Sequence, residues 1–158
     1  MNHHGERHYN LRFIVVTVSS TRTKETDVSG KSMVNMLSKD YKNICFDIVK
    51  DDEIEILSSL FKNINDYDVF IFIGGTGISS KDTTSLSIRK IADREVIGFG
   101  ELFRNRSGGV FPYISDASLF IYKKRIIFTL PGSEDAQPVA YEIIKNIIDH
   151  LYYELNKE

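Results

Sequence analysis

One short segment constrains the fold more than any other part of the sequence. Residues 69–73, Val-Phe-Ile-Phe-Ile, form an unbroken apolar run of β-branched and aromatic residues, and Gly74-Gly75-Thr76-Gly77 follows directly. An apolar run of this length without alternation is typical of a strand that is buried on both faces of a parallel sheet. The sequence therefore predicts a central strand that ends in a glycine-rich loop.

The three glycines indicate what such a loop could bind. Without Cβ atoms a bulky anion can approach the backbone, and positive φ angles let successive N–H groups point inward. The loop also lies where open α/β sheets bind ligands, between the carboxyl end of a strand and a helix N-terminus. Phosphate fits this description. The alternative is a tight strand-to-helix turn with no ligand, and the spacing matches neither a Walker A loop nor a dinucleotide fingerprint.

Two aspartates near this loop require a further explanation. Asp82 follows the glycines by five residues, and Asp51 follows a second predicted strand, residues 43–49, whose end can face the same crevice. A carboxylate repels phosphate unless a cation lies between them, and Mg²⁺ commonly bridges carboxylates to phosphate oxygens. The alternatives are structural: Asp82 bonds nearby backbone, and Asp51 or Asp52 caps the next helix.

Alternating strand and helix patterns predict an α/β fold. We expect a three-layer α/β/α domain with a mostly parallel sheet and one antiparallel edge, formed by a hairpin through Lys123-Lys124. Asp27 or Ser29, Thr84, and Ser133 are the expected caps of three further helices, the last of which is long and amphipathic. The predicted strands cover residues 11–18, 43–49, 69–73, 118–122 and 125–130.

Length and composition predict one domain over residues 11–158, preceded by a disordered tail over residues 1–10. A net charge of −2 provides no basic surface for nucleic acid or anionic membrane, and no apolar run approaches the roughly 20 residues of a membrane span. The single cysteine, Cys45, is expected to be a buried thiol, which suits a reducing cytoplasm.

Several motifs together resemble the MoaB/Mog family of molybdenum-cofactor biosynthesis, and the MoaB branch most closely. The resemblance runs from about Arg12 to Leu151. In chain order the motifs are Gly74-Gly75-Thr76-Gly77, Asp82-x-Thr84, Asp93-Arg94-Glu95, Gly98-Phe99-Gly100-Glu101-x-Phe103-Arg104 and Leu130-Pro131-Gly132-Ser133.

This resemblance implies a molybdopterin-binding domain that uses ATP and Mg²⁺ to adenylylate molybdopterin and releases pyrophosphate. It implies that Asp51 and Asp82 are catalytic and hold the metal. The other residues to which it gives a role in binding pterin or nucleotide are Asp27, Ser29, Gly30, Gly74, Gly75, Thr76, Gly77, Glu101, Ser115, Pro131, Gly132 and Ser133.

The sequence also departs from the family. Most members have Leu-Ser-Arg before the last strand, whereas this chain has Ile114-Ser115-Asp116, so any anion contact of that arginine is lost. A protein that binds or carries molybdopterin without adenylylating it therefore stays as the alternative. The family assembles as trimers, and the aromatic, glycine-rich stretch from Phe99 to Tyr113 is the expected interface of a homotrimer, which could pair further into a dimer of trimers.

Overall fold

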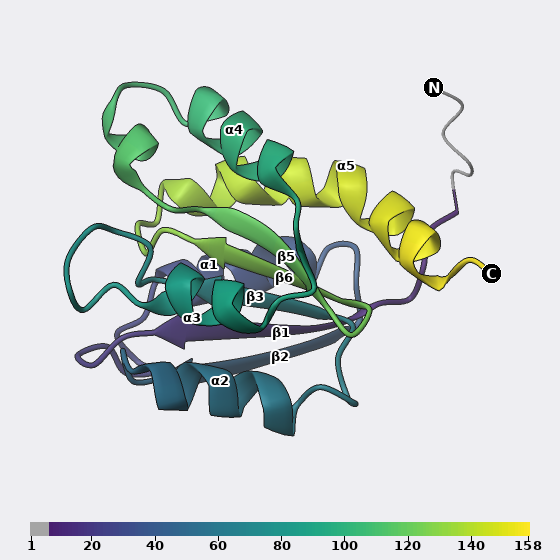
Figure 1. The fold of residues 1–158 in the computed structure, drawn as a ribbon, viewed down its shortest axis with the longest axis horizontal. Coiled ribbons are helices and arrows are strands. Elements are labelled where there is room, and N and C mark those ends of the chain that lie inside the picture. The colour runs from purple at the N-terminus through teal and green to yellow at the C-terminus, as the bar shows by residue number, and fades with distance from the viewer. Residues whose placement is uncertain (1–6) are drawn as a thin grey trace.

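The computed structural model describes residues 7–158, and one six-stranded sheet forms its centre (Figure 1). The sheet has the order β2-β1-β3-β6-β5-β4, and β2, β1, β3 and β6 run parallel. The strands are β1 (Arg12–Val18), β2 (Asn43–Val49), β3 (Val69–Ile73), β4 (Arg94–Glu95), β5 (Ser118–Tyr122) and β6 (Arg125–Leu130).

Helices cover both faces of this sheet, as an α/β/α arrangement requires. One core packs α1, α4 and α5 against one face, and a second core packs α2 and α3 against the other. All five side chains of β3 are fully buried between the two cores. The helices are α1 (Ser29–Leu37), α2 (Glu53–Lys62), α3 (Thr84–Ile91), α4 (Ile97–Arg106) and α5 (Ala136–Asn156), with a short 3₁₀ helix η1 (Phe111–Ile114).

The strand order brings four loops to one edge of the sheet. The chain leaves β1 toward β2 on one side and then returns past β1 to β3 on the other, so the order reverses between β1 and β3. Open α/β sheets bind ligands in the crevice outside such a reversal. Because β5 is antiparallel to β6, with Ser118 opposite Thr129, the chain segment that precedes β5 also reaches this edge.

Most predicted elements are confirmed, and the antiparallel hairpin is one of them. Lys123 and Lys124 both have positive φ, 46° and 64°, which is the backbone of a two-residue type I′ turn. Strand β4, helix α4 and η1 were not predicted. Of the tail expected over residues 1–10, residues 1–6 lie outside the described part, but His8 and Tyr9 contact α5 through Asp149.

Three expectations about local structure are corrected. Thr84 is the first residue of α3 and not its cap, which is Thr83. Ser133 precedes the cap of α5, Asp135, by two residues. Cys45 lies on the outer strand β2 and is only half-buried, because no further strand covers that side of the sheet within the described chain.

Candidate functional site

An open cavity of about 650 Å³ lies at the carboxyl edge of the sheet. It is formed by the loops that follow β1, β2, β3 and β6, together with the segment that precedes β5. Its lining residues are Val18, Ser19, Ser20, Thr21, Arg22, Asp51, Gly74, Gly75, Thr76, Gly77, Lys81, Asp82, Ser115, Pro131 and Gly132.

The backbone of the glycine loop needs glycine at two positions. Gly74 and Gly75 have φ angles of +108° and +69°, in the region that side chains disfavour. A Cβ on Gly74 would lie 2.5 Å from the carbonyl oxygen of Val18, and one on Gly75 would lie 2.2 Å from Thr84 Oγ1. The loop is thus pressed against β1 and against the start of α3, and a bound group can approach its backbone closely.

Asp51 and Asp82 line this cavity together, although 31 positions of sequence separate them. Asp82 accepts a hydrogen bond from the backbone N–H of Ser79 at 3.0 Å, which fixes it in the loop before α3. Asp51 does not cap α2: Asp52 does so, accepting from the Glu55 N–H at 3.3 Å. The capping alternative is therefore wrong for Asp51, whose carboxylate is directed elsewhere.

The surroundings of Asp51 disfavour its charged form. Burial raises its pKa above the ordinary value, and the neighbouring Asp82 carboxylate raises it further, while Lys81 acts in the opposite direction. Its Oδ1 is buried and has no hydrogen-bond partner among residues 7–158, and the same holds for Thr84 Oγ1. Buried polar atoms without a partner are rare in proteins and call for an explanation, such as an ion.

These oxygen donors fit a hard divalent cation such as Mg²⁺, which often takes one or two carboxylates and completes its shell with substrate phosphates and water. Asp51 and Asp82 supply those two carboxylates. No group of three or more His, Cys, Asp or Glu side chains that could hold a metal occurs among residues 7–158.

Asp27, Ser29 and Gly30 lie behind the cavity and do not line it. The buried Asp27 carboxylate accepts from Thr17 Oγ1 at 3.1 Å and from the Gly30 N–H at 2.9 Å. The N-cap of α1 is Val28, so the expectation that Asp27 or Ser29 caps this helix is wrong. Ser29 Oγ donates to the Gly132 carbonyl at 2.7 Å. These residues therefore connect the start of α1 to the loop after β6.

Thr76 and Ser115 connect the glycine loop to the segment before β5. Their hydroxyl oxygens lie 3.1 Å apart, and the Asp116 N–H donates to the Thr76 carbonyl at 2.7 Å. Arg104 holds the same segment from α4, donating to the carbonyls of Ser115 and Ala117 at 3.2 and 3.1 Å. Ser115 is thus fixed beside the glycines.

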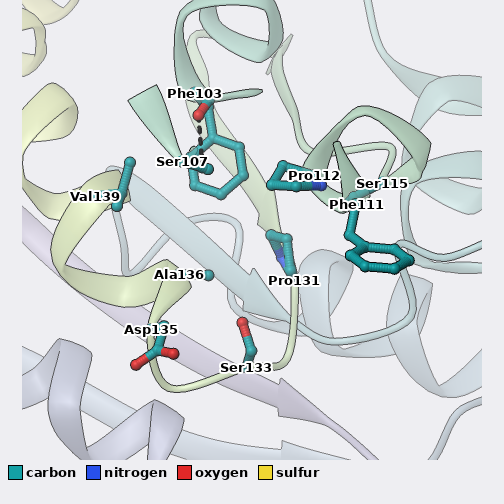
Figure 2. Close-up of a pocket in the computed structure, with 10 residues that line it drawn as sticks. All are labelled: Phe103, Ser107, Phe111, Pro112, Ser115, Pro131, Ser133, Asp135, Ala136 and Val139. Carbon is teal, nitrogen blue, oxygen red and sulfur yellow. Dashed lines mark hydrogen bonds between the residues drawn. The ribbon is translucent and has the colours of Figure 1, made fainter. Parts of the chain in front are cut away.

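A second, more apolar cavity of about 250 Å³ adjoins the first and shares Ser115 and Pro131 with it (Figure 2). Phe103 and Val139 form one side of it, and Figure 2 shows the Ser133 hydroxyl directed inward between Pro131 and Ala136. Ser133 therefore faces this smaller cavity and not the one that holds the aspartates.

Glu101 is not brought to either cavity. It is exposed on α4 and lines neither space. Sequence reasoning missed Arg22 and Lys81, the two cations of the larger cavity. Arg22 could have been considered because it lies in a loop that leaves a strand at the ligand edge, but nothing in that polar loop distinguishes it from Lys24.

The geometry defines an α/β domain with a crevice at the carboxyl edge of its sheet, lined by a glycine loop, two carboxylates and two cationic side chains. Comparison with known proteins identifies the family. Residues 14–150 match the family model described as a probable molybdopterin binding domain. The chain belongs to this family.

Curated relatives agree with this assignment. Molybdenum cofactor biosynthesis protein B of Bacillus cereus is 34% identical over 156 residues, which cover 94% of this chain and 92% of that protein. The protein of the same name from Staphylococcus aureus is 36% identical, over 93% of both. Both relatives are therefore similar to this chain over nearly their whole length.

Solved structures have the same fold. A crystal structure of molybdenum cofactor biosynthesis protein B superposes with a TM-score of 0.89 at 33% identity and covers 95% of this chain and 98% of its own. The crystal structure of the tungsten cofactor synthesizing protein MoaB of Pyrococcus furiosus superposes with a TM-score of 0.85 at 34% sequence identity, and the match covers 96% of this chain and 100% of that chain. No helix of residues 7–158 is long and apolar enough to span a membrane.

Proposed function

We propose that the protein acts in molybdenum cofactor biosynthesis as a Mg²⁺-dependent adenylyltransferase that transfers AMP from ATP to molybdopterin. Its family and the names of its relatives support the pathway. The observation that carries the proposed activity is the pairing of Asp51 and Asp82 in one cavity beside the glycine loop. A protein that only bound a phosphorylated ligand would gain nothing from two acids at that position.

The proposed reaction is a nucleotidyl transfer. An oxygen of the terminal phosphate of molybdopterin attacks the α-phosphorus of ATP, the new O–P bond forms, and the bond to the bridging oxygen of the β-phosphate breaks. Pyrophosphate leaves with that oxygen. Such a reaction needs positioning and neutralisation of charge and no nucleophilic side chain.

The residues divide this work between them. The backbone of Gly74 to Gly77 would approach the phosphates, and Asp51 and Asp82 would hold Mg²⁺, which when bound neutralises negative charge on the phosphates. Thr76 and Ser115, connected through their hydroxyls, would keep the loop in place. A cation would also offset the burial and the repulsion by Asp82 that together raise the pKa of Asp51.

The alternative is a protein that binds or carries molybdopterin without adenylylating it. One observation favours it: position 116, an arginine in most of the family, is an aspartate here, and its carboxylate is engaged by Arg89. An anion contact from that position is therefore absent.

A turnover assay separates the two functions. Purified protein is incubated with molybdopterin, ATP and Mg²⁺, and adenylylated molybdopterin and pyrophosphate are measured. We expect both products in equal amounts. Binding of molybdopterin with neither product would support the carrier function instead.

We also propose that the protein assembles as a homotrimer and that two trimers can pair. Several large apolar side chains of α4, η1 and the loop between them are exposed in the single chain, and exposed apolar patches mark interaction sites. Phe111 is 80% exposed and Val110 is 74% exposed.

A further inference from the structure

Arg22 connects two walls of the larger cavity. It belongs to the loop after β1, and its Nη1 donates to the Gly132 carbonyl at 3.1 Å. The same nitrogen lies 3.6 Å from Asp27 Oδ1. The side chain is 41% exposed and lines the cavity with Gly74 and Gly132. Arg22 is therefore held at a defined position and is still open to a ligand.

Asp27 explains why Arg22 is held there. The Asp27 side chain is fully buried, and its Oδ2 is occupied by Thr17 Oγ1 and the Gly30 N–H. Its Oδ1 has no hydrogen bond within the described chain, and Arg22 is the cation that faces it. A buried carboxylate needs a compensating charge, so Asp27 restricts where the guanidinium can lie.

The guanidinium retains unused donors. An arginine presents five N–H groups in a planar fork, and the side-chain hydrogen bond that Arg22 makes with the rest of residues 7–158 engages only Nη1. Nε and Nη2 remain, which is the edge that binds phosphate in a bidentate manner. Lys81, the other cation of the cavity, lies close enough to Asp51 to lower the pKa of that carboxyl, against the larger effect of burial.

We propose that Arg22 binds a phosphate group of the substrate and that Asp27 is a positioning residue that acts through Arg22. The inference rests on the proposed function only in that the ligand is phosphorylated. Both ATP and molybdopterin carry phosphate, and the structure assigns the chemistry of the contact: a phosphate ester bound by a pre-oriented guanidinium. This assigns to Asp27 a role that does not require contact with the ligand.

The test compares the affinities of variants for ATP with Mg²⁺ and for molybdopterin, each measured by calorimetry. Arg22→Gln should weaken binding of at least one of them roughly ten- to hundredfold, since hydrogen bonds between charged partners are the strong ones. The ligand that loses affinity identifies which phosphate is bound. Arg22→Lys should retain part of the affinity, and Asp27→Asn should cause a smaller loss than Arg22→Gln.

Two controls distinguish this role from a structural one. Lys24→Gln removes the same charge from the same loop outside the cavity and should bind both ligands as the unmodified protein does. Ser29→Ala removes the other hydrogen bond to the Gly132 carbonyl without changing any charge, and it should lose much less affinity than Arg22→Gln.

Unchanged affinity of Arg22→Gln for both ligands would overturn the proposal. An equal loss in Ser29→Ala would also overturn it, because release of the Gly132 loop would then be sufficient. If Arg22→Gln does not fold, the ligand affinities of Arg22→Lys and Lys24→Gln are compared instead. A loss of affinity in Arg22→Lys but not in Lys24→Gln supports the proposal, and equal affinities overturn it. A failure of the adenylylation assay would leave these binding results intact, so the two proposals fail separately.

Discussion

The guanidinium of Arg89 binds both oxygens of the Asp116 carboxylate, with Nη1–Oδ2 and Nη2–Oδ1 distances of 2.9 Å. The same guanidinium binds Glu95 through Nε and Nη2, at 3.3 and 2.9 Å. Arg89 therefore connects α3, β4 and the segment before β5.

This pairing gives the unusual aspartate a structural role. Burial raises the pKa of Asp116, but hydrogen bonds from Arg89 and Ser118 outweigh it and hold the net pKa below the ordinary value. The backbone of Asp116 is fixed as well, since its N–H donates to Thr76 and its carbonyl accepts from Ser85 Oγ at 2.5 Å. Asp116 thus supports the glycine loop from behind.

Replacing Asp116 should lower stability. The Arg89–Asp116 ion pair is about one-third exposed, and exposed ion pairs contribute little to stability. We therefore expect Asp116→Asn to lower the free energy of unfolding by only about 1 kcal/mol. Asp116→Arg should cost more, since it places a third cation near Arg89 and Arg104. The double variant Arg89→Asp, Asp116→Arg should recover part of that loss in denaturant unfolding. A double variant less stable than Asp116→Arg alone would contradict the pairing.

Removing either cavity carboxylate should abolish turnover. Asp51→Asn and Asp82→Asn keep the size of the side chain but remove the charge that would hold Mg²⁺, so the adenylylation rate should collapse while the thermal midpoint stays unchanged or rises slightly. Asp52→Asn is the matched control, because asparagine caps a helix about as well as aspartate. Near-normal rates for both cavity variants at saturating Mg²⁺ would rule out the two-carboxylate mechanism.

The stabilising effect of Asp51→Asn should depend on pH. The pKa of Asp51 is raised by folding, so its ionisation opposes the folded state; this penalty grows as pH rises from the ordinary pKa of an aspartate and is complete above the raised pKa. Well below the ordinary pKa of about 3.9 the carboxyl is protonated in both states and the penalty vanishes. The variant should therefore have the higher thermal midpoint at pH 7 without Mg²⁺, and the difference should shrink toward zero near about pH 3. A constant difference over this range would contradict the assignment.

Gly75→Ala should destabilise the protein and impair ligand binding. The alanine would adopt a φ of +69°, which costs roughly 1–2 kcal/mol, and its Cβ would collide with the buried Thr84 Oγ1. Gly108→Ala is a control for the strain of a positive φ without a steric clash, because φ is +74° there and nothing lies within 4 Å of the added Cβ. Chemical unfolding of the two variants should show the larger loss for Gly75→Ala, and equal losses would mean that the contact with Thr84 is unimportant.

The assembly can be tested by light scattering. A homotrimer should have three times the 18.1 kDa mass of the chain, and Phe111→Glu should shift it toward the monomer because a charge cannot be buried in an apolar interface without a partner. The exposed Ile54→Glu on α2 is a matched control on the opposite face of the sheet. A stable monomer of the unmodified protein in dilute solution would remove the trimer proposal.

The parts of the fold that could be predicted are those where burial determines the sequence. Residues 69–73 must be apolar because both faces of β3 are covered, so both ends of this strand were predicted correctly. Helix α4 was not predicted, because Gly98 and Gly100 are poor helix formers. Gly100 is present for packing: a Cβ there would lie 2.6 Å from the Ala117 carbonyl, a contact between segments that a sequence pattern does not show.

Some residues of the candidate site can also be predicted from the sequence and others cannot. Asp51 and Asp82 can be predicted because acidic residues that follow parallel strands meet at one edge of the sheet. The positions of Asp27 and Ser29 behind the cavity cannot be predicted, since their hydrogen bonds join residues up to 103 positions apart. Glu101 was included only through resemblance, and its place on α4 separates it from both cavities.

The position of β6 between β3 and β5 has a consequence for the order of events during synthesis. A nascent chain that has emerged only as far as α4 contains both carboxylates and the glycine loop, but the neighbour of β3 at residues 125–130 has not yet been made. Until it pairs, one edge of β3 is open, and the walls supplied by Ser115 and Gly132 are absent. The crevice can therefore close only when the C-terminal quarter of the chain docks, so a truncated or stalled product would retain its acidic residues and lack a place to bind.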